Sequence, residues 1–138
     1  MSEAKTGAGL AERPTSPHLQ VWRWHVTMWG SILHRVSGIA LYGGALILAG
    51  WVAALASGPG VFMTYKALLG SIPGKLALFV LTLAIFYHLA NGLRHLAWDF
   101  GKGFEPRTAD MTGAAVIAFA IAASLAVWGL AFVSGALA

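Results

Sequence analysis

Three long apolar stretches with very few charged side chains dominate the 138-residue chain. The first covers about 28–56 and contains no Lys, Arg, Asp or Glu after Arg35. The second covers about 75–99, and the third covers about 111–137 without any charged residue. About 20 helical residues cross a hydrocarbon core of ~30 Å, so each stretch is long enough to span a bilayer. The sequence therefore predicts an all-α integral membrane protein with three transmembrane helices.

The composition agrees with this class. Hydrophobic residues make up 58% of the chain and charged residues 10%, whereas a soluble domain has about 25% charged residues. The chain has no cysteine, which excludes disulfides, thiolate-bound zinc and iron–sulfur clusters held by this chain alone. The net charge of +4 comes from basic residues near the ends of the apolar stretches. The charge therefore indicates membrane topology, and no nucleic-acid partner is expected.

The polar residues before the first apolar stretch form a separate segment. Residues 1–27 include Glu3 and Glu12. They match neither a secretory signal, whose apolar core comes earlier, nor a transit peptide, which is rich in Arg and poor in acidic residues. We therefore expect a cytoplasmic N-terminal segment over 1–27, a three-helix membrane-anchor domain over 28–138, and a location in the bacterial inner membrane.

Basic residues predict the orientation of the helices in the lipid bilayer. The N-terminal segment and the second loop carry Lys5, Arg13, Arg23, Lys102 and Arg107, and the first loop carries Lys66 and Lys75. Cytoplasmic loops carry an excess of Lys and Arg, so the N-terminus and the second loop are expected in the cytoplasm. The tryptophans agree with these interfaces: Trp22, Trp24, Trp29 and Trp98 at the inner one, Trp51 and Trp128 at the outer one.

The first loop, 57–74, has its own pattern between two Gly- and Pro-containing triplets at 58–60 and 72–74. Apolar residues recur between the triplets at helical spacing, namely Val61, Phe62, Tyr65, Leu68 and Leu69. The pattern favours a short helix in the membrane interface. An ordered loop that only connects two spans is the alternative.

The third apolar stretch carries a stripe of small residues at four-residue intervals, Ala114, Ala118, Ala122 and Ala126. Small side chains let helix backbones approach closely in lipid. We interpret the stripe as a packing surface without a chemical role.

Two histidines seven residues apart lie within the second apolar stretch. On a helix His88, Gly92, His95 and Asp99 share one face, with His95 about 10 Å closer to the cytoplasm than His88. Ionisable side chains cost roughly 2.5–3.5 kcal/mol each near the bilayer centre, and histidine is a common ligand of haem iron. His88 is therefore a candidate haem ligand, and Gly92 leaves room for a flat macrocycle. The alternative for both histidines is a packing role.

The first apolar stretch carries a matching cluster. Ser31, His34, Arg35 and Gly38 lie within about one third of the helix circumference. Because the first helix enters the membrane where the second one leaves it, His34 and Arg35 are expected at nearly the depth of His95. Ser31 and Arg35 on one face can donate hydrogen bonds to a carbonyl oxygen. Arg35 acting only as an interface anchor is the alternative.

Three segments resemble the signatures of a known family. They are Arg13-Pro-Thr-Ser-Pro-His-Leu-Gln20, Ser31-Ile-Leu-His-Arg-Val-Ser-Gly38 and His88-Leu-Ala-Asn-Gly-Leu-Arg-His-Leu-Ala-Trp-Asp99. Their order and patterns resemble the cytochrome b556 anchor subunits of succinate dehydrogenase, in the branch shared by α-proteobacteria and mitochondria. Trp22 is a departure, since that branch usually has tyrosine there.

The resemblance implies a four-subunit succinate:quinone oxidoreductase. A flavoprotein subunit oxidises succinate, an iron–sulfur subunit relays electrons, and two anchors form a heterodimeric bundle that binds one haem b and ubiquinone. Succinate oxidation is then the task of the partner subunits. By motif position, His88 is one axial ligand of the haem iron and the second anchor supplies the other. His34, His95 and Arg35 lie by the haem propionates, while Ser31 and Arg35 hold the quinone.

Three other functions fit the same residues. A haem b electron-transfer cytochrome without a quinone site needs a second ligand from His34 or from outside, because His88 and His95 on one helix face cannot bind one iron from opposite sides. A purely structural assembly subunit uses its buried polar residues only to specify helix partners. A quinol:fumarate reductase has related anchors and the reverse direction, which the resemblance disfavours.

Overall fold

The computed structural model describes residues 24–135, and this part of the chain is helical. The helices are α1 (Val26–Ala56), α2 (Pro59–Gly70), α3 (Ile72–Asp99) and α4 (Pro106–Val133). Within this part, α1, α3 and α4 are long and apolar enough to cross a membrane, whereas α2 is short. The prediction of an all-α protein with three transmembrane helices is confirmed.

Parts of the predictions lie outside the described residues. These are most of the segment 1–27, including the signature at 13–20 and Trp22, and the last residues of the third predicted span.

Helices α2, α3 and α4 begin with proline in the first turn. Proline is favourable there, because the first backbone N–H groups of a helix have no partner within the helix. The Oγ of Ser71 also accepts a hydrogen bond from the N–H of Gly74, 3.2 Å away, and caps α3. The triplet at 72–74, which bounds the predicted short helix, is therefore the first turn of α3.

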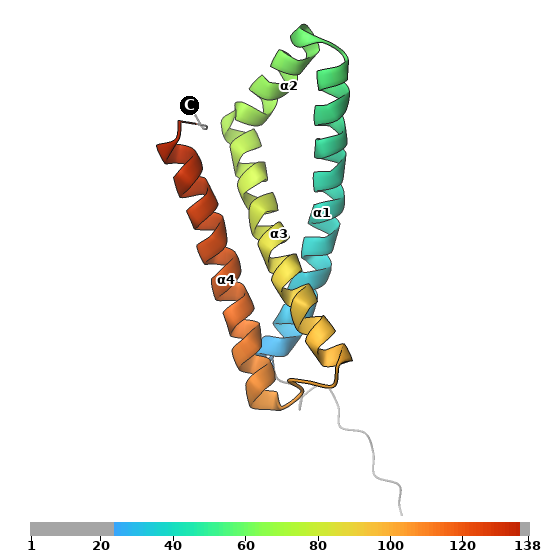
Figure 1. Ribbon diagram of the computed structural model, residues 1–138, viewed down its shortest axis with the longest axis vertical. Helices are drawn as coiled ribbons and strands as arrows, with labels where there is room; N and C mark the ends of the chain where they lie inside the picture. Colours follow the sequence, from blue (N-terminus) through green and yellow to red (C-terminus); the bar gives the residue numbers. More distant parts are fainter. Residues whose placement is uncertain (1–23, 136–138) are drawn as a thin grey trace, which may run out of the picture.

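Helix α3 lies between α1 and α4 and packs against both (Figure 1). Helices α1 and α3 cross near the end where α3 connects to α4, here called the loop end, and diverge toward the opposite end, which α2 closes and which is here called the α2 end (Figure 1). Between α3 and α4 the buried core contains Tyr87, Val116 and Ala120. The tightest packing of α4 is therefore against α3.

The alanine stripe of α4 does not contribute to this packing. Ala114, Ala118, Ala122 and Ala126 are all exposed in the described chain. The residues of α4 that are buried are instead Ala109, Gly113, Val116, Ala120 and Ser124. The prediction that the alanine stripe packs is therefore not met within this chain, because a neighbouring face of the same helix, which is equally rich in small residues, meets α3.

Helix α2 is the short helix predicted between the two Gly- and Pro-containing triplets, and it is fixed against α1. The Tyr65 hydroxyl donates a 2.8 Å hydrogen bond to the carbonyl of Ile47. Gly50 makes this approach possible, because a Cβ at position 50 would lie 2.7 Å from the Tyr65 hydroxyl oxygen. The α2 end is thus tied to the transmembrane helices.

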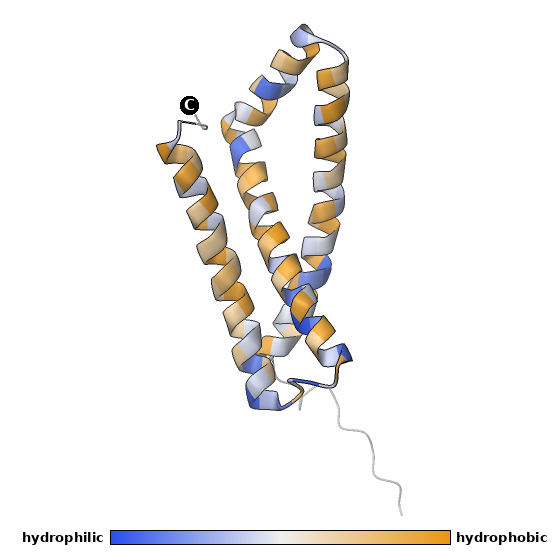
Figure 2. Ribbon diagram, in the orientation of Figure 1, coloured by the Kyte–Doolittle hydropathy of each residue, from blue (hydrophilic) through white to orange (hydrophobic). Residues whose placement is uncertain are grey.

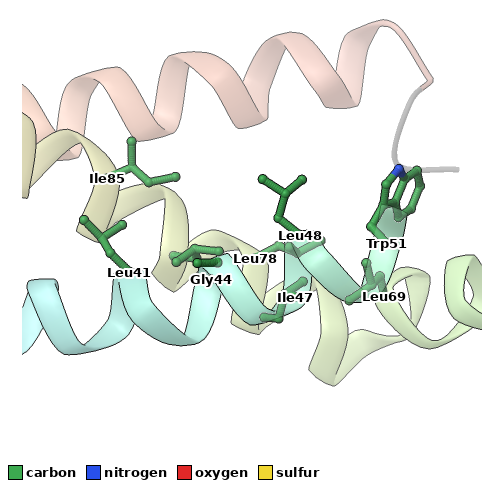
Figure 3. Close-up of a pocket in the computed structure, with 10 residues that line it drawn as sticks. Leu41, Gly44, Ile47, Leu48, Trp51, Leu69, Leu78 and Ile85 are labelled. Carbon is green, nitrogen blue, oxygen red and sulfur yellow. The ribbon is translucent and has the colours of Figure 1, made fainter. Parts of the chain in front are cut away.

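A cleft of about 590 Å³ opens between α1 and α3 below α2. Its walls contain only apolar side chains and glycine, among them Leu41, Leu48, Trp51 and Ile85 (Figure 3). A surface without ionisable groups, whose one side-chain donor is the indole N–H of Trp51, can accommodate apolar chains but offers little to a redox reaction. The polar side chains gather elsewhere, where α1 and α3 cross.

Candidate functional site

Three histidines from α1 and α3 meet where these helices cross. The rings of His34 and His88 are stacked, with centroids 4.0 Å apart and planes 11° from parallel. The ring of His95 contacts His34 edge-on at 5.0 Å. Figure 2 shows hydrophilic segments of both helices at this crossing, whereas the stretches toward the α2 end are mostly apolar. The two polar clusters expected at a common depth therefore lie in contact.

The hydrogen bonds around His88 determine which of its ring nitrogens is available. Its Nδ1 lies 3.1 Å from the Oγ of Ser37 and 3.2 Å from the carbonyl oxygen of His34. The Ser37 hydroxyl donates its own proton to that same carbonyl, 2.8 Å away. Both neighbours of Nδ1 are therefore acceptors, so Nδ1 carries the proton and Nε2 keeps its lone pair.

Ser37 and Gly38 on α1 make the position of His88 possible. Ser37 is buried, and a Cβ at Gly38 would lie 3.2 Å from the Cε1 atom of His88. The sequence alone indicates no particular role for Gly38 and does not single out Ser37. Ser37 lies three residues after His34, about one turn further along the same helix. The neighbouring motif gives no reason to choose Ser37 as a site residue.

Two ring nitrogens of the histidine cluster lack partners. The Nδ1 atoms of His34 and His95 are buried and have no hydrogen bond within the part of the chain that the structure describes. A buried polar atom without a partner costs about 1–3 kcal/mol. By contrast, the space beside Gly92 is open, since no atom lies within 4 Å of an added Cβ. The cluster therefore keeps two buried ring nitrogens whose hydrogen-bonding capacity no described residue uses.

Ser31 and Arg35 lie one turn apart on α1, at the open edge of the same cluster. Ser31 is half-buried and Arg35 is exposed, and neither has a hydrogen bond or ion pair to another described residue. A charged side chain within a membrane-spanning helix is costly unless it reaches water or meets a partner. This edge of α1 is thus suited to a polar ligand or to a neighbouring subunit.

A second polar face of α3 was assigned no role from the sequence, apart from the expectation that Trp98 marks the membrane interface. Tyr87, Asn91, Arg94 and Trp98 follow each other about one turn apart, roughly 90° around the helix from His88 and His95. The Tyr87 hydroxyl donates a 2.7 Å hydrogen bond to the carbonyl of Gly30. This face therefore links α3 to its neighbours. The helical spacing of these four residues is visible in the sequence, but the functional role was assigned to the histidines of the same motif.

Arg94 joins α3 to α4 although it is only 7% exposed. Its guanidinium donates to the Thr112 hydroxyl (3.0 Å), the Asn91 side-chain oxygen (3.3 Å) and the Ala109 carbonyl (2.7 Å). The Asn91 side chain is 1% exposed and has no other partner among the described residues. The buried charge is thus stabilised by neutral acceptors on two helices.

We expect Arg94→Leu to lower the free energy of unfolding by about 3 kcal/mol, because it leaves the Asn91 amide wholly unpaired and removes the bonds to α4. Thermal unfolding of the purified complex measures the effect. Arg107→Leu is the matched control, since Arg107 is exposed at the start of α4 and its replacement should change stability by less than about 0.5 kcal/mol. Equal midpoints for the two variants would contradict the role of Arg94.

Taken together, the fold and the site define a multi-pass helical membrane protein with a histidine and arginine cluster at one end of its bundle. Residues 10–127 match the family model described as succinate dehydrogenase/fumarate reductase transmembrane subunit. The chain therefore belongs to this family, and it is a membrane cytochrome b subunit of succinate dehydrogenase.

Relatives from bacteria and mitochondria agree with this assignment. The succinate dehydrogenase cytochrome b556 subunit of Rickettsia felis is 36% identical over 85% of this chain and 91% of its own length. That of Paracoccus denitrificans is 39% identical over 77% of this chain and 82% of its own length. The mitochondrial cytochrome b560 subunit of Mus musculus is 41% identical over 83% of this chain and 69% of its own length.

Proposed function

We propose that this chain and a second anchor subunit hold one haem b between them, and that His88 Nε2 would bind its iron. The protonated Nδ1 of His88 faces two acceptors, the Ser37 hydroxyl and the His34 carbonyl. Histidines that bind metals usually donate their other ring N–H in this way, which fixes the ring and raises its basicity. This hydrogen bonding is the observation that carries the proposal, and the residues present fit the group.

The second axial ligand has to come from outside this chain. His34 is the nearest other imidazole, but its ring is stacked on His88 and nearly parallel to it. Two rings stacked face to face cannot bind one iron from opposite sides of a porphyrin. The geometry therefore disfavours a cytochrome that supplies both ligands itself.

His34, His95 and Arg35 are proposed to bind the haem propionates. The unpartnered Nδ1 atoms of His34 and His95 can each donate a hydrogen bond to a carboxylate once protonated, and the Arg35 guanidinium adds a permanent positive charge. When bound, the haem supplies one-electron redox chemistry. The protein residues orient it and compensate the negative charge of its carboxylates.

Ser31 and Arg35 are proposed to hold ubiquinone during its reduction. A quinone carbonyl oxygen gains negative charge as electrons arrive, and donors already in place stabilise that charge without reorganisation. The Ser31 hydroxyl can donate one hydrogen bond, and Arg35 supplies both donors and charge. Ser31 and Arg35 both remain accessible at the open edge of the histidine cluster.

The proposed assembly is a complex of this chain with a second anchor, an iron–sulfur subunit and a flavoprotein subunit that oxidises succinate. Because this chain has no cysteine, its electrons have to come from clusters on a partner. We place the loop end and residues 1–27 on the cytoplasmic side of a bacterial inner membrane and the three-helix domain, 28–138, in the bilayer, following the basic residues.

Purification of the complex from native membranes tests this function. We expect four subunits and a reduced-minus-oxidised spectrum of one haem b per complex. If this chain bound low-spin haem b without a second anchor, it would instead be a self-contained cytochrome. An assembled complex without haem would contradict the proposed role of His88.

A further inference from the structure

Trp98 occupies the space between the histidine cluster and the loop that joins α3 to α4. From the sequence it was expected only to mark the membrane interface. In the structure its indole ring contacts His95, with centroids 5.0 Å apart and planes inclined by 30°. Trp98 therefore touches the cluster directly.

The orientation of His95 depends on ring contacts. Its Nδ1 is buried without a partner, and its ring makes no hydrogen bond to any residue between 24 and 135. Its ring contacts in this part of the chain are the edge-on contact with His34 at 5.0 Å and the contact with Trp98. If the indole were removed, the imidazole would lose the support on one side.

Trp98 itself is fixed by contacts on its other sides. Its Nε1–H donates a 3.1 Å hydrogen bond to the carbonyl of Gly103 in the α3–α4 loop. The Arg94 guanidinium lies 4.0 Å from the indole centroid, within the range of a cation–π interaction. The ring of Phe104 is stacked on the indole at 5.9 Å and 19°. Three independent contacts thus hold the indole in one pose.

We propose that Trp98 is a positioning residue that holds the His95 imidazole toward His34 and connects its orientation to the α3–α4 loop. This inference rests on the proposed function for the role of His95 toward the haem. It adds that the orientation of this imidazole depends on an aromatic side chain and on a loop, neither of which is proposed to bind a ligand.

Diethyl pyrocarbonate labelling of histidines in the intact purified complex, read by peptide mass spectrometry, tests the proposal. In Trp98→Leu we expect the rate at His95 to rise several-fold, because the imidazole gains space and solvent access. Labelling of His88 should stay at the wild-type rate, since its own hydrogen bonds hold it. Trp98→Phe should restore most of the protection of His95, because it keeps an aromatic face.

Two further variants complete the experiment. Trp128→Leu makes the same substitution at the α2 end and should leave labelling of His95 unchanged. Phe104→Leu alters an exposed side chain and should give a smaller rise at His95, which keeps the test available if Trp98→Leu does not assemble.

Wild-type rates at His95 in both Trp98→Leu and Phe104→Leu would overturn the inference, as would equal acceleration at His88 and His95. Neither result depends on the haem spectrum, so failure of the positioning role can be told apart from failure of the proposed function.

Discussion

Arg35→Leu will lower succinate:quinone reductase activity about 100-fold or more, because the loss of one preorganised donor at a developing oxyanion costs that much in other enzymes. Succinate oxidation with an artificial electron acceptor should remain close to the wild-type rate, since that chemistry belongs to the partner subunits. The two assays, run on the same purified complex, separate a defect at the quinone site from a general loss of activity.

Two variants sharpen this prediction. Arg35→Lys keeps the charge but loses the planar fork of donors, so its activity should lie between those of wild type and Arg35→Leu. Arg107→Leu removes an exposed arginine at the start of α4 and should keep full activity. Equal loss of quinone reduction and artificial-acceptor activity in Arg35→Leu would exclude a role at the quinone.

His88→Ala will abolish the low-spin haem b spectrum of the assembled complex, because no other described imidazole of this chain is placed to replace it. His34 is stacked on His88, and His95, two turns further along α3, meets His34 edge-on. A reduced-minus-oxidised spectrum and a haem stain of the purified complex measure the loss.

The matched control for this substitution is His25→Ala, which removes an imidazole from the exposed start of α1 and should leave the spectrum intact. A wild-type spectrum and midpoint potential in His88→Ala would remove His88 from the ligand set. Loss of the spectrum in both variants would indicate that the complex had not assembled.

Much of the architecture and the candidate site followed from local patterns. Uninterrupted apolar runs predicted three spans, and the helical spacing of His88 and His95, with His34 and Arg35 on the other helix, predicted a common cluster. These predictions succeeded because the depth of a residue in the membrane follows from its position along a helix. In antiparallel neighbouring helices, residues at equal depth lie side by side.

The contacts that support the cluster could not be predicted in the same way. Helical spacing gives the face on which Arg94 or Trp98 lies, but it does not say which neighbour that face meets. On α4 two neighbouring faces carry small residues, and only one of them contacts α3. A Cβ at Gly113 on that face would lie 3.3 Å from Val26 and 3.7 Å from the Arg94 guanidinium. Which face of α4 contacts α3 thus depends on side chains from three helices.

The divergence of α1 and α3 toward α2 also bears on bioenergetics. The residues that line the cleft between them include no ionisable side chain, so none of them can relay a proton. With the redox groups held at the loop end as proposed, electrons and protons would enter and leave on one side. Moving one charge across 100 mV is worth about 2.3 kcal/mol. The proposed arrangement then predicts turnover that neither builds nor spends the membrane potential.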